Sequence, residues 1–420
     1  MISDRLYEYA FAYKKTKLWK VLFDSDLFAL RLSDGSIGYV SIMGKLGEYC
    51  ALALYIGEEG IDTFFTAAEA DEFQMSPLDY QEHLMSQNCL QCAFDKKDEL
   101  AREEQEEVKQ YARDHGIRLS GRNAYPMFFQ YLPNHIPWQL QTDEEQKMLC
   151  EALEAAIEMA RLLEKNTPKE LGFIEEGRPN EIPFLEKKGN TYVLGKTALP
   201  EKKPKQWPSP EITNDIMAAN LKKNPRKGVW ECKIVRFPEA VKEPEEDIPV
   251  FPVILLAIDT QTEYLLPVSP VCYYEEQPQK LLDLFLDTLQ QQKICPKELK
   301  VQEERTYAFA ENLCKKLGIS LTMEEQLPFL EEVEYDFFNH FGGNNEEEIE
   351  TVMGFLYEML NMTKDQIRQF PPEILSQIES LIGQEVLPLE LERELRQLLP
   401  GEKPKKTGDR IISFSKNLDK

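Results

Sequence analysis

Several features that would identify an enzyme or a membrane protein are missing from this chain of 420 residues. The apolar run Val253–Ile258 is far shorter than the roughly 20 residues that a membrane helix needs. Charges at Asp4, Arg5 and Glu8 leave no room for the apolar core of a signal peptide. We therefore expect no membrane association and a cytoplasmic location.

The common catalytic signatures are also absent. The chain has 4 histidines and no HExxH or HxxxH spacing among them, which argues against a zinc protease of that type. Neither a GxxxxGK[ST] loop nor a GxGxxG loop is present, so the usual nucleotide-binding turns are excluded. GxSxG is missing as well. Nucleophilic catalysis by serine, or by cysteine with histidine, stays open, although no pair is indicated.

Cysteine is sparse, with 8 residues in the whole chain, and Cys89 and Cys92 form the single CxxC. A structural zinc site needs four ligands and usually a second such pair, which the sequence lacks. A redox role would place the motif at a helix N-terminus, where thiol pKa values fall. We favour a third interpretation, two small buried residues on one strand face or in a turn. Scattered thiols of this kind suit a reducing compartment.

Basic residues are outnumbered, 49 against 74 acidic ones, which gives a formal net charge of −25. Such a surface repels phosphate backbones, so nucleic acid is not an expected partner, although a local basic patch remains compatible. Hydrophobic residues make up 42% of the chain, enough for packed cores. The composition thus predicts an acidic multidomain protein.

The order of patterns along the chain predicts an α+β multidomain fold. We expect an N-terminal mixed α/β domain at 1–170, in which Asp34-Gly35 turns between two strands and Ser76-Pro77 begins a helix. A connector rich in proline and lysine follows at 171–248, with a β-hairpin and the strand VWECKIVRF. The remaining parts are an α/β domain at 249–343, a small helical domain at 344–400 and a flexible tail at 401–420.

The stretch Phe251–Gly343 has the most regular alternation of strands and helices. Carboxylates fall at strand ends within it and on its last predicted helix. Asp259 ends an apolar strand, and Glu303 and Glu304 end the strand ELKVQEE. Glu331 and Glu334 lie on the helix LPFLEEVEYDFFNHF. These carboxylates are candidate catalytic residues, and surface or helix-cap charge is the alternative that we favour.

This stretch resembles the ribonuclease-H-like fold of integrases and transposases, at the Asp with its Thr-x-x-Tyr-like hairpin and at the lysine-rich lead into an acidic strand end. The resemblance implies a site for two magnesium ions with Asp259 as first ligand. Glu303 or Glu304 would be the second, and Glu331 or Glu334 the third. The chain departs from the pattern, because Glu stands where Asp is usual and Arg305-Thr306 replaces Asn-Gly.

From YAFAYKKTKLWKVL onward, the layout also resembles an uncharacterised bacterial family that pairs two α/β domains of unknown function. No activity comes with that resemblance. We expect a non-catalytic binding or regulatory module without a cofactor or metal, acting on a protein partner of unknown identity. The alternative is a nuclease or phosphoryl-transfer enzyme that depends on Mg or Mn. The oligomeric state stays open.

Overall fold

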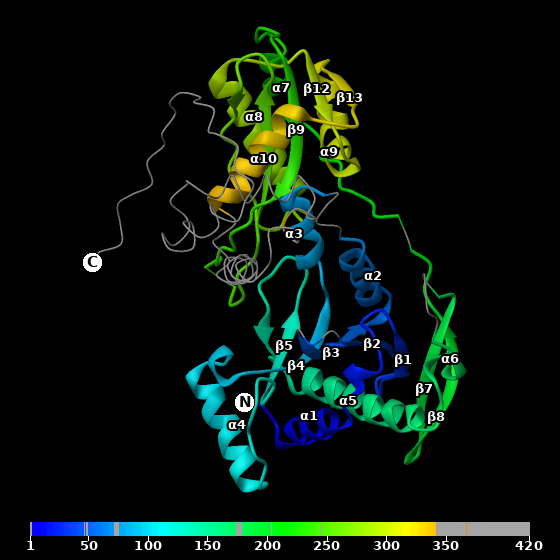
Figure 1. Cartoon of the computed structure of the whole chain (residues 1–420). Helices are drawn as coiled ribbons and strands as arrows, with labels where there is room; N and C mark the ends of the chain where they lie inside the picture. Colours follow the sequence, from blue (N-terminus) through cyan, green and yellow to red (C-terminus); the bar gives the residue numbers. More distant parts are fainter. Residues whose placement is uncertain are drawn as a thin grey trace, which may run out of the picture. The chain divides into compact units, whose positions relative to one another are not determined.

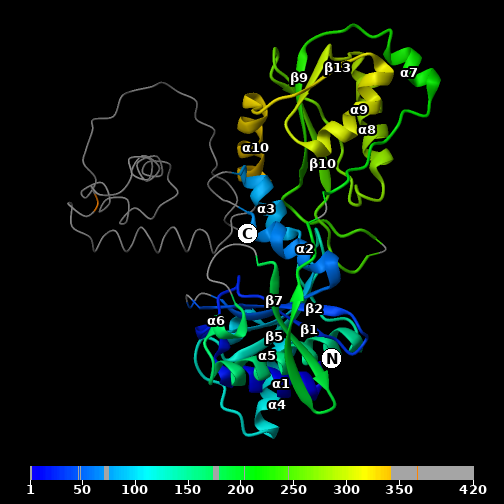
Figure 2. The same cartoon turned by 90° about the vertical axis from the view of Figure 1, so that its right-hand side faces the viewer.

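The computed structural model describes residues 2–341 except 46, 48, 71–74, 174–178, 203 and 245, and also the single residue 367. The predicted helical domain at 344–400 and tail at 401–420 lie outside the described residues, apart from residue 367. The described part is mixed α/β, as expected, with two separate sheets (Figures 1 and 2). None of the helices described is long and apolar enough to cross a bilayer.

The first sheet has eight strands in the order β6-β5-β4-β3-β2-β1-β7-β8. All neighbours pair antiparallel except β1 and β7, which run parallel. The antiparallel order from β1 to β6 follows from short apolar runs. A turn at Gly35, where φ is +93°, joins β1 to β2, and longer helical segments join β3 to β4 and β4 to β5. The strands are β1 Phe28–Arg31, β2 Ile37–Met43, β3 Cys50–Ile56, β4 Cys89–Asp95, β5 Tyr125–Tyr131, β6 Trp138–Gln139, β7 Glu181–Lys188 and β8 Thr191–Ala198.

Helices cover both faces of this sheet. The larger core lies on the face of α1 and α5, and a smaller one lies beneath α2 (Figure 1). The predicted capping box of α5 is confirmed, since Thr142 Oγ1 accepts from Glu145 N at 3.1 Å and Glu145 Oε2 accepts from Thr142 N at 2.9 Å. The helices are α1 Asp4–Thr16, η1 Leu18–Lys20, α2 Gly57–Ala68, α3 Pro77–Met85, η2 Lys97–Glu99, α4 Arg102–Asp114, α5 Asp143–Leu163 and α6 Pro168–Leu171.

The second sheet has five strands in the order β11-β10-β9-β12-β13. β9 pairs antiparallel with β10 and parallel with β12, so the central strand of the sheet is β9. Helices α7, α8 and α9 contribute to the core on one face, and α10 packs on the other. The elements are α7 Asp215–Leu221, β9 Val229–Arg236, β10 Val253–Asp259, β11 Tyr264–Leu265, α8 Pro278–Gln292, β12 Glu298–Val301, α9 Glu304–Leu317, β13 Ser320–Met323 and α10 Pro328–Phe341.

The segment expected to be a connector takes part in both sheets. Its hairpin, β7–β8, extends the first sheet through parallel pairing with β1. Its strand VWECKIVRF contains β9, which is buried on both faces in the middle of the second sheet. The prolines and lysines around these strands predicted an irregular connector that contains a hairpin and a strand. These β elements are present, and they pair with strands far away in the sequence.

Candidate functional site

The predicted carboxylates do not share one place in the second sheet. Asp259, at the end of β10, lies opposite Trp230 of β9, and Trp230 lies opposite Leu299 near the start of β12. Glu303 follows the other end of β12, four residues beyond Leu299. At about 3.3 Å per residue, roughly 13 Å of strand separates the two positions. Asp259 and Glu303 therefore lie toward opposite ends of the sheet.

Asp259 holds a turn. Its Oδ1 accepts from Gln261 N at 3.0 Å, and its backbone oxygen accepts from Glu263 N at 2.8 Å. Gly228 lies directly against the carboxylate, because a Cβ at that position would be 2.8 Å from Oδ1. These hydrogen bonds stabilise the turn after β10 and give Asp259 a structural role.

The glutamates near α9 and α10 have distinct environments. Glu303 is the N-cap residue of α9, and its Oε1 accepts from Thr306 Oγ1 at 2.8 Å. Glu304 and Glu331 are exposed. Glu334 is buried, with 2% of its side chain exposed, and pairs with Lys233 at 3.0 Å. Of these candidates, Glu303 and Glu334 both lie next to buried cations.

Those cations form the most unusual feature of the second sheet. Lys233 and Arg236 lie in the carboxyl half of β9, and Arg305 lies in the first turn of α9, directly after β12. Their side chains are between 2% and 5% exposed. Because β9 and β12 run parallel, their carboxyl ends lie at the same edge of the sheet. Binding sites of α/β folds commonly lie at such an edge.

Helix α3, from the first half of the chain, supplies acids to this edge. Ser76 caps the helix, accepting at its Oγ from Asp79 N at 3.3 Å, and Pro77 occupies the first turn. Asp79 and Glu82 are three residues apart, so they lie on one face of α3. On the same side of the second sheet, Leu78 packs with Val235, Leu256 and Leu330. An apolar contact and two acids thus hold α3 against β9 and α10.

The ion pairs are close and well directed. Arg305 binds both carboxylate oxygens of Glu82, Nη1 to Oε1 at 2.5 Å and Nη2 to Oε2 at 3.0 Å. Lys233 Nζ donates to Asp79 Oδ2 at 2.7 Å as well as to Glu334. Arg236 Nη2 donates to Glu275 Oε1 at 3.0 Å, and its Nε lies 3.7 Å from Glu82 Oε1. Every cation of the cluster therefore meets a carboxylate.

The pKa values follow from this pairing. Burial alone would raise the pKa of Glu82, but the charges of Arg305 and Arg236 outweigh burial and lower that pKa to about 2. Burial raises the pKa of Glu334, and the charge of Lys233 only partly offsets it. Burial would lower the pKa of Lys233, yet Asp79 and Glu334 raise it overall. Glu82 is consequently ionised and Lys233 charged at neutral pH.

The sequence of β9 contains an indication of this cluster, in the form of charged residues within an apolar strand. The strand VWECKIVR places Glu231, Lys233 and Arg236 among apolar residues, and charges inside a buried strand need partners. The partner of Lys233 on α3 is 154 residues away, so the pairing itself could not be read from local patterns.

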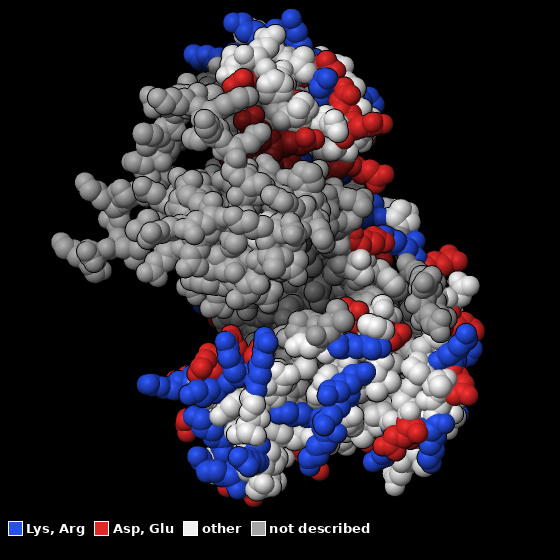
Figure 3. All heavy atoms as spheres, viewed as in Figure 1, with Lys and Arg blue, Asp and Glu red and all other residues white. Residues whose placement is uncertain are grey.

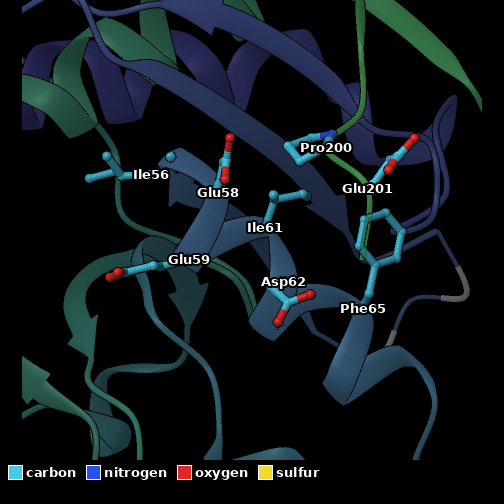
Figure 4. Close-up of a pocket in the computed structure, with 9 residues that line it drawn as sticks. Ile56, Glu58, Glu59, Ile61, Asp62, Phe65, Pro200 and Glu201 are labelled. Atoms are coloured by element: carbon cyan, nitrogen blue, oxygen red, sulfur yellow. The ribbon is translucent and has the colours of Figure 1, made fainter. Parts of the chain in front are cut away.

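A pocket of about 520 Å³ lies beside the N-terminal half of α2 (Figure 4). Ile61, Phe65 and Pro200 form apolar parts of its wall, while Glu58 and Glu201 contribute acids. Within the ranges that the structure describes, no set of three or more His, Cys, Asp or Glu side chains is placed to hold a metal ion. The wall of the pocket is thus partly apolar and partly acidic.

Cys89 and Cys92 lie on β4 and are both buried. Cys89 packs into the core beneath α2, and Cys92 packs into the core on the opposite face, beneath α1 and α5. Burial raises the pKa of the Cys89 thiol to about 12, and it raises that of Cys92 further. The two thiols therefore do not converge on a shared zinc ion, and neither has a lowered pKa. The prediction of two small buried residues agrees with the structure, but they lie on opposite faces of β4 and not on one face, because residues three apart on a strand point to opposite sides.

Two family models match the chain. Residues 4–178 match a domain of unknown function (DUF7309), and residues 217–338 match a second domain of unknown function (DUF6930). The two matches fit the pairing of two domains that the resemblance in the sequence implies. No curated protein matches the chain.

Solved structures with some similarity include two viral proteins. The HTLV-2 integrase catalytic core domain in complex with magnesium, in its trimeric form, is 12% identical, with 41% of this chain and 83% of that chain covered and a TM-score of 0.19. The simian T-cell lymphotropic virus intasome in complex with PP2A regulatory subunit B56 gamma is 14% identical, with 46% and 65% covered and a TM-score of 0.18. Similarity at this level carries no conclusion about activity.

Proposed function

We propose that this protein is a non-catalytic binding or regulatory module, in which a ribonuclease-H-like sheet serves as a scaffold. One observation carries the proposal. The shared carboxyl edge of β9 and β12 holds buried cations, Lys233, Arg236 and Arg305, and helix α3 covers them with Asp79 and Glu82. The edge that would bind a ligand is used to join α3 to the second sheet.

The chemistry of the edge supports this proposal. Magnesium in phosphoryl-transfer sites needs several carboxylate oxygens with unbalanced negative charge. Here the carboxylates of Glu303 and Glu334 already lie against Arg305 and Lys233, and a divalent cation would be repelled by the same cations. Asp259, the first ligand that the resemblance implies, lies toward the other end of the sheet.

The rival function is a Mg- or Mn-dependent nuclease or phosphoryl-transfer enzyme. The strand pattern favours it, because an antiparallel set of three strands continues into two parallel strands, with helices α8, α9 and α10 following in the expected order. That pattern supports a ribonuclease-H-like ancestry for the second domain, without indicating that a working site persists.

Calorimetry with Mg²⁺ and Mn²⁺, together with cleavage assays on single-stranded and double-stranded DNA and RNA, separates the two functions. We expect no binding heat and no cleavage for the full chain. The rival function would be established by metal binding and cleavage that Asp259→Asn abolishes while Glu201→Gln, a matched acid far from that sheet in sequence, retains both.

We further propose a bacterial, cytoplasmic setting and a protein partner. The support is the acidic net charge and eight cysteines without a disulfide among them, seven of them buried. Purification of a tagged chain from its native host under reducing conditions should recover a reproducible partner, and the proposal of a protein partner fails if repeated preparations yield none.

A further inference from the structure

The last strand of the first sheet, β8, has an open edge. It pairs with β7 along one side from Thr191 to Ala198, and within the described residues no strand pairs with its other side. Figures 1 and 2 show the β7–β8 hairpin at the rim of the sheet. An open edge presents a row of unpaired backbone donors and acceptors, which can template pairing with another strand.

Other edges of the two sheets are protected by their length, and β8 is not. Strands β6 and β11 have two residues each, and β13 has four. β8 has eight residues and contains one charged side chain, Lys196, and no proline. Its pairing with β7 is continuous, so no bulge twists the edge away. Apart from the charge of Lys196, the edge thus lacks the devices that usually prevent association.

The side chains of β8 divide cleanly between its two faces. Tyr192, Leu194 and Lys196 point to the face of α5, since the Tyr192 hydroxyl donates to Glu154 Oε2 on that helix at 3.2 Å. Val193 points to the opposite face. Val193 is 45% exposed and Leu194 is 36% exposed, which leaves an apolar centre on the edge.

We propose that β8 pairs antiparallel with β8 of a second copy of this chain, about a two-fold axis that passes through Leu194. A two-fold axis perpendicular to the sheet leaves each face of the sheet on its own side, so only residues on the same face can lie opposite each other. Such residues are an even number of positions apart, and the axis must therefore lie between one residue and the same residue of the second copy. With the axis at Leu194, seven residues of each β8 pair and the two leucines lie opposite each other.

This register is self-complementary. Tyr192 of one copy lies opposite Lys196 of the other, and Thr191 lies opposite Thr197. Each Lys196 would approach the ring of Tyr192, whose hydroxyl already binds the carboxylate of Glu154. No two like charges are directly opposite. An axis at Gly195 would instead place the apolar Leu194 opposite the charged Lys196. The register centred on Leu194 therefore fits a second copy better.

This assembly is independent of the proposed function, because it uses the first sheet and none of the charged cluster at α3. Two copies would form one continuous sheet with α5 on the same side in both. The partner is therefore a second copy of the chain. It is recognised by the backbone of β8 together with three kinds of side-chain pair, Leu194 with Leu194, Tyr192 with Lys196 and Thr191 with Thr197.

Analytical ultracentrifugation of the full chain over a range of concentrations tests the proposal. We expect a reversible dimer that Leu194→Lys weakens by about tenfold or more, because it places two like charges face to face at the axis. Ile216→Lys, a matched change at a side chain that is 77% exposed on α7, should leave the dimer intact. The proposal is overturned if the chain stays monomeric at every concentration, or if Leu194→Lys leaves the dissociation constant of the dimer unchanged.

Disulfide trapping tests the register. Opposite residues of an antiparallel pair have Cα atoms about 4.5–5.5 Å apart, within reach of a disulfide. Leu194→Cys should therefore crosslink two copies under mild oxidation. Val193→Cys should not crosslink, because residue 193 lies opposite Gly195 of the second copy, and the Cα atoms of the two residues 193 are about 8 Å apart. Equal crosslinking of the two variants would overturn the Leu194 axis.

Discussion

Arg305 and Glu82 form a two-point ion pair across 223 residues of sequence, with both guanidinium Nη atoms on the two carboxylate oxygens. Arg305 is 3% exposed and Glu82 is 17% exposed. The same guanidinium also donates to the backbone oxygen of Ile234. This pair anchors α3 on the second sheet, so stability experiments on it report whether the contact forms in solution.

Replacing Glu82 by glutamine should destabilise the protein by about 3 kcal/mol, because Arg305 and Arg236 would remain buried with less compensating charge. Urea denaturation measures this change in the free energy of unfolding. Glu106→Gln is the control, because Glu106 pairs with Lys109 on the exposed face of α4, where solvent screens the pair and its loss should change stability little. Equal effects in the two variants would show that the Glu82 contact is not formed.

Stability should fall as the pH drops from about 4.3, the pKa of an unfolded glutamate, toward about 2, the pKa of folded Glu82. The folded pKa is depressed, so the contribution of Glu82 is present above the unfolded pKa and is lost as the carboxylate takes up a proton. Denaturation curves between pH 5 and pH 2 measure the slope. Glu82→Gln should flatten it relative to the unchanged chain, and an identical slope would contradict a depressed pKa.

Lys233→Met should cost about 3 kcal/mol, since it leaves the buried Glu334 beside the partly exposed Asp79 without a cation. Adding Asp79→Asn and Glu334→Gln removes both orphaned charges and should recover most of the loss, as buried ion pairs often exchange for neutral groups at little cost. Thermal unfolding of the single and triple variants measures the recovery. A triple variant that is less stable than Lys233→Met would mean that the acids do not face Lys233.

Gly228→Ala should destabilise the protein by about 2 kcal/mol or more, from a left-handed φ of +73° together with a methyl group 2.8 Å from the Asp259 carboxylate. Gly121→Ala isolates the backbone term, because Gly121 has a φ of +92° and open space around its missing Cβ. The difference between the two variants in urea denaturation measures the crowding. It should vanish when Asp259→Ala is combined with Gly228→Ala.

Local patterns were sufficient for most secondary structure in the part of the chain described. The Ser76-Pro77 start of α3, the capping box of α5 and the alternation of strands and helices after Phe251 all depend on neighbours within a few residues. These elements follow from hydrogen bonds and steric preferences that act over a single turn. The same reasoning placed Asp259 at the end of β10, whereas Glu303 and Glu304, expected at the end of a strand, begin α9.

Local patterns could not show which distant segments come together. The resemblance implied a shared metal site for Asp259 and Glu303, but the direction of β10 relative to β9 and β12 sends them to opposite ends. Local patterns also assigned VWECKIVRF to a connector, although long-range pairing makes this strand the centre of a sheet.

The sequence by itself determined the secondary structure, the acidic balance of charge and the residue types at each strand end. Tertiary structure alone decided which charges meet, because Glu82 finds Arg305 and Lys233 finds Asp79 only once α3 docks on β9. The physical reason is that a buried charge is tolerated only beside its counter-charge, and the counter-charges that α3 brings to Lys233 and Arg305 come from more than 150 residues away.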